Sequence, residues 1–262
     1  MRTISIINQK GGVCKTTTAL TIGEGLGRKG YRVLFVDLDP QGNMSYTLGA
    51  DRVELSIADA LRNPAEVREA VNKGVRYKCS SLSSSHDLSL VDSFLPAKGR
   101  EYRLREALAP LSNEYDYCII DTPPALGTLT VNALTASESV IIPTLADTYS
   151  IKGIYMLNES IETVKLYTNR GLYIRGIVIT KYNGRSNIKR ALAINLRRVA
   201  EELNTRLYKT RIREGVAMLE AQILKKSIFD YAPRSNTALD YSALIEEVLE
   251  GDKEDNNQLR SK

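Results

Sequence analysis

Runs of apolar, β-branched residues recur along the chain and are separated by longer stretches that carry polar residues. Five of these runs predict buried strands, at residues 3–7, 32–37, 115–121, 139–143 and 172–180. Four further stretches predict helices, at residues 16–29, 100–111, 149–167 and 241–250. Because strands that alternate with helices form parallel sheets, we expect an α/β fold with a doubly wound, mostly parallel sheet flanked by helices.

Residues 50–100 give weaker signals than the rest of the chain. Short helices are predicted at residues 57–61 and 65–72, and a short strand at residues 88–91. Residues 80–85 are all serine or leucine and favour a loop. We find neither a repeat nor a linker, so residues 1–251 are expected to form a single domain, followed by a polar, disordered tail over residues 252–262.

The composition narrows the cellular setting. The chain has 262 residues, a formal net charge of +5 and three cysteines, Cys14, Cys79 and Cys118. An odd number of widely spaced cysteines argues against a disulfide framework and favours the reducing cytoplasm. No apolar run is long enough to span a bilayer, and the chain begins on a strand instead of a signal segment. The positive charge permits a polyanionic partner without establishing one.

The turn between the first strand and the first helix has the composition of a phosphate-binding loop. Gly11 and Gly12 precede Lys15, and the helix then opens on the hydroxyl groups of Thr16 and Thr17. Backbone N–H groups in such a turn and the positive end of the helix attract an anion, while the lysine adds a point charge. Thr16, as the residue after the lysine, is placed to offer its hydroxyl to Mg²⁺.

Three aspartates stand at or just after the ends of apolar strands. Asp37 and Asp39 come at the end of the run 32–37, and Asp121 ends the run 115–121. Ligands of open parallel sheets bind outside the carboxyl ends of the strands, so these side chains should face the glycine-rich turn. A carboxylate in the position of Asp121 holds Mg²⁺ directly or through water.

The turn departs from the usual phosphate-loop pattern, G-x-x-x-x-G-K-[ST], because Gln9 and Cys14 occupy its two glycine positions. A second lysine, Lys10, precedes the glycines, and this arrangement resembles the deviant Walker A loop, K-G-G-x-G-K-[ST], of the ParA/MinD superfamily of P-loop ATPases. Residues 37–43 and 121–124 resemble the switch I and switch II segments of that family. The resemblance covers residues 1–251 and, without a helix-turn-helix extension, is to the short chromosomal type of ParA protein.

This resemblance implies an ATP hydrolase whose cofactors are ATP and Mg²⁺. The residues implied to bind ATP are Lys10, Gly11, Gly12, Val13, Cys14, Lys15, Thr16 and Thr17, with Thr180 and Lys181 near the base. Those implied to bind the metal are Thr16, Asp37 and Asp121, and those implied in catalysis are Lys10, Lys15 and Asp39. In this scheme Asp39 orients the attacking water. Lys10 reaches the ATP of a second subunit, so that two subunits sandwich two nucleotides.

Basic residues gather in the C-terminal part of the chain, as non-specific contact with phosphates requires. The resemblance implies that they bind double-stranded DNA, and the candidates are Arg185, Lys189, Arg190, Arg213 and Lys225. It also implies a homodimer with ATP, a ParB-type centromere-binding partner that stimulates slow hydrolysis, no membrane partner, and a nucleoid-associated location in the cytoplasm. The implied function is plasmid or chromosome partition.

Alternatives stay open for the function and for one residue. A MinD-like or polar-positioning ATPase that does not bind DNA, and a small-molecule ligase or kinase of the related metabolic branch, would share the same loop. Cys14 replaces a glycine that tolerates unusual backbone angles, and a cysteine forced into them costs about 1–3 kcal/mol. This cysteine is a tolerated variant, a cause of weaker nucleotide handling, or a thiol that senses oxidation.

Overall fold

The computed structural model describes residues 1–184 and 187–260, with side chains up to residue 253. Its centre is an eight-stranded sheet in the order β3-β4-β2-β5-β1-β6-β7-β8. The strands are β1 Arg2–Ile6, β2 Val33–Asp37, β3 Val71–Arg76, β4 Cys79–Leu82, β5 Tyr117–Asp121, β6 Ser139–Thr144, β7 Tyr173–Tyr182 and β8 Leu207–Arg213. Every described pair of neighbouring strands is parallel except β3–β4, so the predicted doubly wound, mostly parallel sheet is confirmed.

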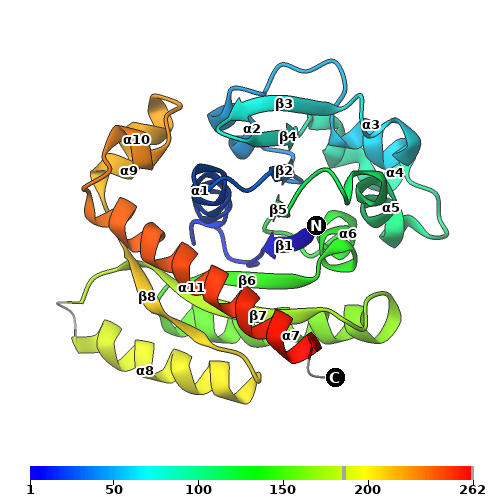
Figure 1. Ribbon diagram of the computed structural model, residues 1–262. Helices are drawn as coiled ribbons and strands as arrows, with labels where there is room; N and C mark the ends of the chain where they lie inside the picture. The colour runs from blue at the N-terminus through cyan, green and yellow to red at the C-terminus, as the bar shows by residue number, and fades with distance from the viewer. Residues whose placement is uncertain (185–186, 261–262) are drawn as a thin grey trace.

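Helices cover both faces of this sheet (Figure 1). They are α1 Lys15–Arg28, α2 Asn43–Leu48, α3 Ile57–Arg62, α4 Val91–Phe94, α5 Arg103–Leu108, α6 Thr128–Ala136, α7 Thr148–Tyr167, α8 Asn187–Glu202, α9 Val216–Ile223, α10 Ile228–Tyr231 and α11 Asn236–Arg260. Helices α1 and α11 share one apolar core with the sheet. On the other face, α3 and α5 pack over the half that contains β2, while α7 and α8 pack over β6 and β7.

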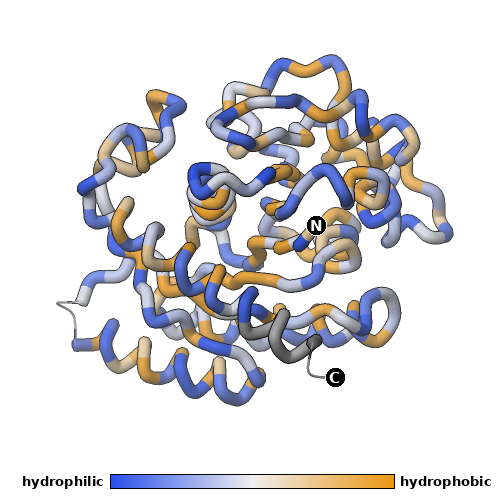
Figure 2. The backbone as a smooth tube through the Cα atoms, viewed as in Figure 1, coloured by the Kyte–Doolittle hydropathy of each residue, from blue (hydrophilic) through white to orange (hydrophobic). Residues whose placement is uncertain are grey.

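The strands next to the candidate loop are buried on both faces, which explains their apolar sequences. Ile4 and Ile6 of β1 belong to the core shared with α1. Ser5 between them points to the opposite face, where its hydroxyl lies 2.6 Å from the hydroxyl of Ser137 and so remains paired although buried. Figure 2 shows apolar residues prevailing along the central strands, whereas hydrophilic residues recur along α8.

Three of the predictions for residues 50–100 are wrong. The predicted helix at 65–72 is a 3₁₀ turn, Pro64–Glu66, followed by β3, and the predicted strand at 88–91 is the junction between a second 3₁₀ turn and α4. The predicted loop at 80–85 is wrong for residues 80–82, which belong to β4, and only residues 83–85 lie outside a helix or strand. Serines can occupy this buried strand where their hydroxyl groups find partners; the oxygen of Ser81, for example, lies 3.2 Å from that of Ser83, just after the strand. Strand β8 and helix α6 were not predicted.

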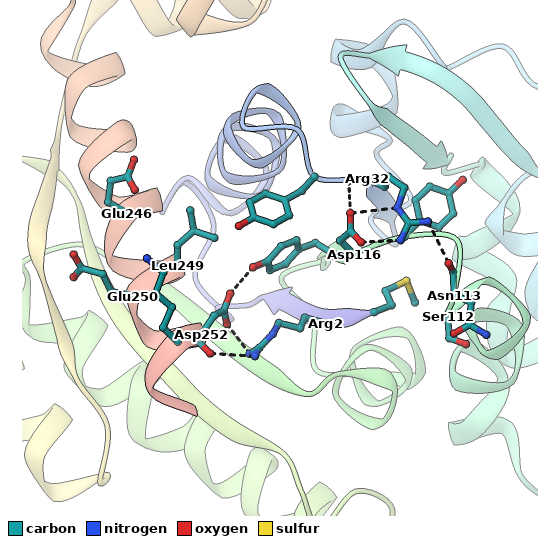
Figure 3. Close-up of a pocket in the computed structure, with 14 residues that line it drawn as sticks. Arg2, Arg32, Ser112, Asn113, Asp116, Glu246, Leu249, Glu250 and Asp252 are labelled. Atoms are coloured by element: carbon teal, nitrogen blue, oxygen red, sulfur yellow. Dashed lines mark hydrogen bonds and ion pairs between the residues drawn. The ribbon is translucent and has the colours of Figure 1, made fainter. Parts of the chain in front are cut away.

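The predicted boundary at residue 251 falls too early, because α11 continues from Asn236 to Arg260. Asp252, assigned above to a disordered tail, is buried. Its carboxylate accepts hydrogen bonds from Arg2 Nη1 at 2.7 Å, from Tyr117 Oη at 2.6 Å and from Arg175 Nη1. Figure 3 shows Arg2 reaching Asp252 beside a cavity of about 720 Å³. Residue 252 is therefore part of the folded domain.

This cluster lies at the amino edge of the sheet, which also carries a second ion pair. Arg32, just before β2, places Nη2 2.7 Å from Oδ1 of Asp116, just before β5, as Figure 3 also shows. The paired charges join the starts of neighbouring strands to each other and to α11. Among the described residues, no helix has the length and apolar character that crossing a bilayer requires.

Candidate functional site

The glycine-rich turn lies at the carboxyl edge of the sheet, between β1 and α1, and two buried side chains hold it there. Asn8 donates from Nδ2 to the carbonyl of Pro143 at 2.8 Å, and its Oδ1 accepts the Lys10 N–H at 2.9 Å. The hydroxyl of Thr180, in β7, lies 3.1 Å from the carbonyl oxygens of both Val13 and Thr144. Thr180, predicted to lie near the base, is thus placed beneath the turn, with 1% of its surface exposed.

The backbone of the turn is left-handed at Gly12, with φ 74°, and at Cys14, with φ 66°. A Cβ added at Gly11 or Gly12 would meet no heavy atom within 4 Å, so there is open space beside these two residues. At Cys14 the same conformation costs about 1–2 kcal/mol, because its Cβ approaches the following carbonyl. Burial also raises the pKa of the Cys14 thiol, which disfavours the thiolate that oxidation sensing needs.

Lys15 begins α1 and is largely buried, with 8% of its surface exposed. Its Nζ donates to the carbonyl of Lys10 at 3.3 Å, so the ammonium group is held against the turn. Burial lowers the pKa of Lys15, while the charges of Asp121 and Asp39 oppose that shift. A desolvated cation in this place has a strong attraction for an anion such as phosphate.

Asp121 ends β5 directly opposite Asp37, which ends β2. It is fully buried, and neither of its carboxylate oxygens has a hydrogen-bond partner among the described residues. Burial, with the charge of Asp37 as a further cause, raises the pKa of Asp121 well above its ordinary value, while the Thr16 hydroxyl opposes the shift. An orphaned carboxylate beside a threonine hydroxyl offers the oxygen ligands that Mg²⁺ prefers, so the residues fit this ion.

Asp37 and Asp39 differ in their surroundings. Oδ2 of Asp37, which is buried, accepts the N–H of Ser45 at 2.8 Å and its hydroxyl at 2.7 Å. Burial raises the pKa of Asp37 to about 6, although these hydrogen bonds oppose the shift. Asp39 is partly exposed, and its Oδ1 accepts the N–H of Gln41 at 3.0 Å. The fold therefore gathers the predicted acidic residues and Lys15 at one edge, with Asp39 at the rim.

Lys10, the second lysine of the turn, is held within its own chain. Its Nζ lies 2.6 Å from Oδ2 of Asp147 and 3.5 Å from the hydroxyl of Ser150. Asp147 is also the N-cap of α7, where its Oδ1 accepts the N–H of Ser150 at 2.8 Å. Burial opposes these contacts, but together they lower the pKa of Asp147 below its ordinary value. This pairing was not predicted from the sequence, because the two residues are 137 positions apart.

A cavity of about 430 Å³ adjoins the turn and extends the predicted site. Gly12, Cys14 and Lys181 contribute to its wall, as does Thr17. Much of the rest comes from residues 212–216 and from Gln222 and Tyr241, none of which the sequence pattern marked for this role. Two of these lining residues contact α1. Gln222 donates to the Thr17 hydroxyl at 3.0 Å, and the Tyr241 hydroxyl lies 3.1 Å from that of Thr18.

Known proteins resemble the chain over nearly its whole length. A family model described as an AAA domain matches residues 1–174. The sporulation initiation inhibitor protein Soj of Bacillus subtilis (strain 168) is 38% identical over 248 residues, which cover 94% of this chain and 97% of Soj. The chain belongs to the ParA/MinD superfamily. A second relative is the chromosome partitioning protein ParA of Myxococcus xanthus (strain DK1622). It is 35% identical over 254 residues, which cover 96% of this chain and 89% of that ParA.

A solved structure bears on the chemistry of this ParA/MinD site. The crystal structure of cobyrinic acid a,c-diamide synthase from Mycobacterium smegmatis with bound ADP and magnesium has a TM-score of 0.83 and 32% identity, and the match covers 97% of this chain and 96% of that one. The predicted superfamily and P-loop fold are thus confirmed. That structure is named as a synthase, whereas Soj and ParA are named for sporulation and chromosome partition, so similar chains carry the names of different functions.

The basic residues implied by the ParA/MinD resemblance do not form one group. Arg190 is exposed on α8 and Lys189 is partly exposed there, whereas Arg213 makes a bidentate ion pair with Asp240 of α11. Lys225 follows α9, where its Nζ lies 3.6 Å from the ring centre of Tyr46. Figure 1 places α8 and α9 on different parts of the molecule, and Arg185 lies outside the described residues.

Proposed function

We propose that this protein is a Mg²⁺-dependent ATPase that acts as an ATP-gated dimer switch in plasmid or chromosome partition. The observation that carries the proposal is the buried carboxylate of Asp121, which has no partner among the described residues and lies close to Thr16 and Lys15. A buried carboxylate without donors is costly in its charged form, so it is poised either to hold a proton or to bind a cation. A nucleotide-bound metal ion is that cation.

Each predicted site residue at the carboxyl edge of the sheet then has a role that fits its surroundings. The turn and the ammonium of Lys15 bind the β- and γ-phosphates, and Thr16 and Asp121 hold the metal, with Asp37 supporting it. Magnesium, when bound, neutralises the charge of the phosphates and orients them. Asp39 at the rim orients the attacking water, and the cavity lined by residues 212–216 receives the base and ribose.

In the proposed dimer, Lys10 exchanges one partner for another. Its ammonium leaves Asp147 and contacts the nucleotide of the second subunit, so ATP supplies a negative charge that ADP lacks at that point. We expect size-exclusion chromatography to give a dimer with ATP and a monomer with ADP or no nucleotide. A Lys10→Ala chain should stay monomeric with ATP. If it dimerises and hydrolyses ATP at the native rate, the role across the subunits is wrong.

DNA binding is assigned to the exposed cationic face of α8. Arg190 and Arg197 are seven residues apart and share one side of this helix, and both are exposed. Two copies of that face, brought together by dimerisation, would add their phosphate contacts, which makes binding dependent on ATP and steeply dependent on salt. A ParB-type partner that stimulates hydrolysis would then release the DNA, and the protein would be associated with the nucleoid.

The decisive experiment measures binding to random-sequence duplex DNA with ATP and with ADP over a range of salt concentrations. The native chain should bind with ATP only, and Arg190→Ala plus Arg197→Ala should lower the salt slope by about two per subunit. Arg105→Ala, which removes an exposed arginine from α5, is the matched control and should bind as the native chain does. Binding that is equal with ATP and ADP, or that survives the double substitution, would refute DNA coating.

Such a refutation would favour one of the two other functions. The Mycobacterium smegmatis structure is named for an enzyme that acts on a small molecule and is 32% identical to this chain, which supports a metabolic enzyme as the second candidate. A positioning ATPase of the MinD type would dimerise with ATP without binding DNA. ATP-dependent dimerisation in the absence of DNA binding therefore separates these two, because the metabolic enzyme does not need a nucleotide-gated dimer.

A further inference from the structure

The serine-rich segment after β4, which the sequence favours as a plain loop, reaches the two aspartates at the end of β2. Ser84 is buried, with 7% of its surface exposed, and uses both of its polar groups. Its hydroxyl donates to the carbonyl oxygen of Asp39 at 2.6 Å, and its N–H donates to the hydroxyl oxygen of Ser45 at 2.9 Å. Ser84 therefore touches both ends of the segment that connects Asp39 to α2.

The second of these bonds fixes the direction of a hydroxyl. Because the Ser45 oxygen accepts the N–H of Ser84, the Ser45 hydroxyl hydrogen is directed away, toward Oδ2 of Asp37 at 2.7 Å. Ser84 thus acts on Asp37 through Ser45 and on Asp39 directly. Both contacts come from one residue of the segment that directly follows β4, two residues beyond the end of that strand.

Asp39 has little else to hold it. Its N–H donates to Oδ1 of Asp37 at 3.2 Å, and its carbonyl oxygen also accepts the N–H of Gly42 at 2.9 Å. Among the hydrogen bonds that the described residues make to Asp39, only the bond from Ser84 comes from outside residues 37–42. Without it, the hydrogen bonds of Asp39 would all come from within residues 37–42.

We infer that Ser84 is a positioning residue for hydrolysis, which sets the place of Asp39 relative to the bound nucleotide without touching the nucleotide itself. The inference rests on the proposed ATPase function and deepens it. A group that acts by placing a catalytic carboxylate affects the reacting geometry more than the binding of substrate, because small displacements lower the rate steeply. The expected signature is a fall in kcat with little change in KM.

The test compares three substitutions in the full chain by steady-state ATP hydrolysis. Ser84→Ala should lower kcat by about three- to tenfold, as the loss of one hydrogen bond to the positioned group implies, and should leave KM for ATP within about twofold. Ser84→Thr keeps the hydroxyl and should restore most of kcat. Ser83→Ala is the matched control, because Ser83 is buried in the same segment but its hydroxyl contacts Ser81 and Asn72 and not Asp37 or Asp39. It should keep the native kcat.

Urea unfolding at the assay temperature is measured for every variant, to verify that each chain is folded under the conditions of the kinetic assay. A Ser84→Ala chain with native kcat overturns the inference. An equal fall in kcat in Ser84→Ala and Ser83→Ala also overturns it, since that pattern would mean that any substitution in the segment loosens it. A Ser84→Ala chain that fails to bind ATP also overturns it. If the native chain itself hydrolyses no ATP, the proposed function is wrong and the inference falls with it, an outcome distinct from the other three.

Discussion

The two edges of the sheet each bury a carboxylate, at Asp121 and at Asp252, but their surroundings are opposite. Asp121, at the carboxyl edge, has no hydrogen-bond partner on either oxygen among the described residues. Asp252, at the amino edge, accepts from Arg2, Tyr117 and Arg175. Both residues are at least nine-tenths buried, so exposure does not account for the difference. The donors and the neighbouring charges separate them, because Asp252 is paired with two arginines while Asp121 faces the carboxylate of Asp37.

The comparison separates a buried charge that serves stability from one that serves a ligand. A charge taken out of water costs several kcal/mol unless donors replace its hydration. At Asp252 the chain supplies those donors itself, and the cluster ties α11 to the starts of the strands. At Asp121 the chain leaves them out, so its pKa is raised and its charged form stays unfavourable until a cation binds. We therefore call the carboxyl edge, with the unpaired Asp121, the working edge. We call the amino edge, with the paired Asp252, the supporting edge.

Removal of the Asp121 charge tests this distinction most strongly. Asp121→Asn should lower kcat for ATP hydrolysis by about 100-fold or more, because a metal ligand contributes several kcal/mol to the transition state. The free energy of unfolding of the nucleotide-free chain should not fall, since an uncompensated charge has been removed. Steady-state kinetics and urea unfolding measure the two effects.

Asp116→Asn serves as the control for Asp121→Asn. It removes a partly exposed carboxylate that is ion-paired with Arg32 at the amino edge, so turnover should stay native. An Asp121→Asn chain that hydrolyses ATP at the native rate, or that unfolds at a clearly lower urea concentration, would contradict the comparison.

The converse is expected at the other edge. Asp252→Ala should lower the free energy of unfolding by about 3–5 kcal/mol, because the buried Arg175 would lose its closer carboxylate partner and keep Glu138 at 3.5 Å. Turnover, measured below the melting temperature of the variant, should remain near the native value. Glu250→Ala, on the same helix but exposed, should change stability by less than about 0.5 kcal/mol. Equal losses in the two variants would show that the cluster carries no special weight.

The pH dependence of stability gives a third, smaller test. Burial raises the folded-state pKa of Asp37 from 3.8 to about 6, and raises that of Asp121 as well. Between about pH 4 and 6 the folded chain then binds more protons than the unfolded chain. The free energy of unfolding of the nucleotide-free protein should therefore decrease as the pH rises, by at most about 1.4 kcal/mol per pH unit for each such group.

The control for this slope is Asp121→Asn, which should lose the share that Asp121 contributes. Carboxyl groups with a lowered pKa, such as Asp59 and Asp116, lose their contribution as the pH falls below about 4, so they act outside this window. A nucleotide-free protein whose stability rises steadily from pH 4 to 6 would show that the carboxyl edge is not strained by its charges.

The smallest effect is expected from the backbone of the phosphate loop. Cys14→Gly relieves the left-handed strain at φ 66° but adds freedom to the unfolded chain, so the free energy of unfolding should rise by at most about 1 kcal/mol. Cys14→Ala keeps the Cβ and should not stabilise the protein. Thermal unfolding of the three chains checks the difference. Stabilisation by alanine as large as that by glycine would mean that the thiol, and not the backbone, carries the cost.

The working edge could be predicted from sequence because its residues are close neighbours along the chain or end obvious strands. Lys15 and Thr16 follow the glycines, while Asp37 and Asp121 end continuous apolar runs. Their convergence then follows from the rule that parallel strands present their carboxyl ends together. The fold class rested on the same apolar runs, and the family resemblance sharpened both.

The supporting edge could not be predicted, because its contacts join residues that are remote in sequence. Asp252 lies in a polar stretch, and its partners Arg2 and Arg175 are 250 and 77 residues away. For the same reason, neither the ion pair of Lys10 with Asp147 nor the hydrogen bond from Ser84 to Asp39 could be predicted. Strand β4 was missed for a related reason, since buried serines resemble a loop until their hydroxyl partners are known.

Helix α11 connects the two edges and so determines how a motion could pass between them. Near its start, the Tyr241 hydroxyl contacts Thr18 of α1, and eleven residues later, about 16 Å along the axis, Asp252 is fastened by its three donors. Asp240, next to Tyr241, and Glu247, between these points, accept backbone N–H groups of β8, so this strand also holds the helix. Amide exchange along α11 should then change most near Tyr241 when ATP binds. The amino edge thus anchors α11 at a point remote from its contact with α1.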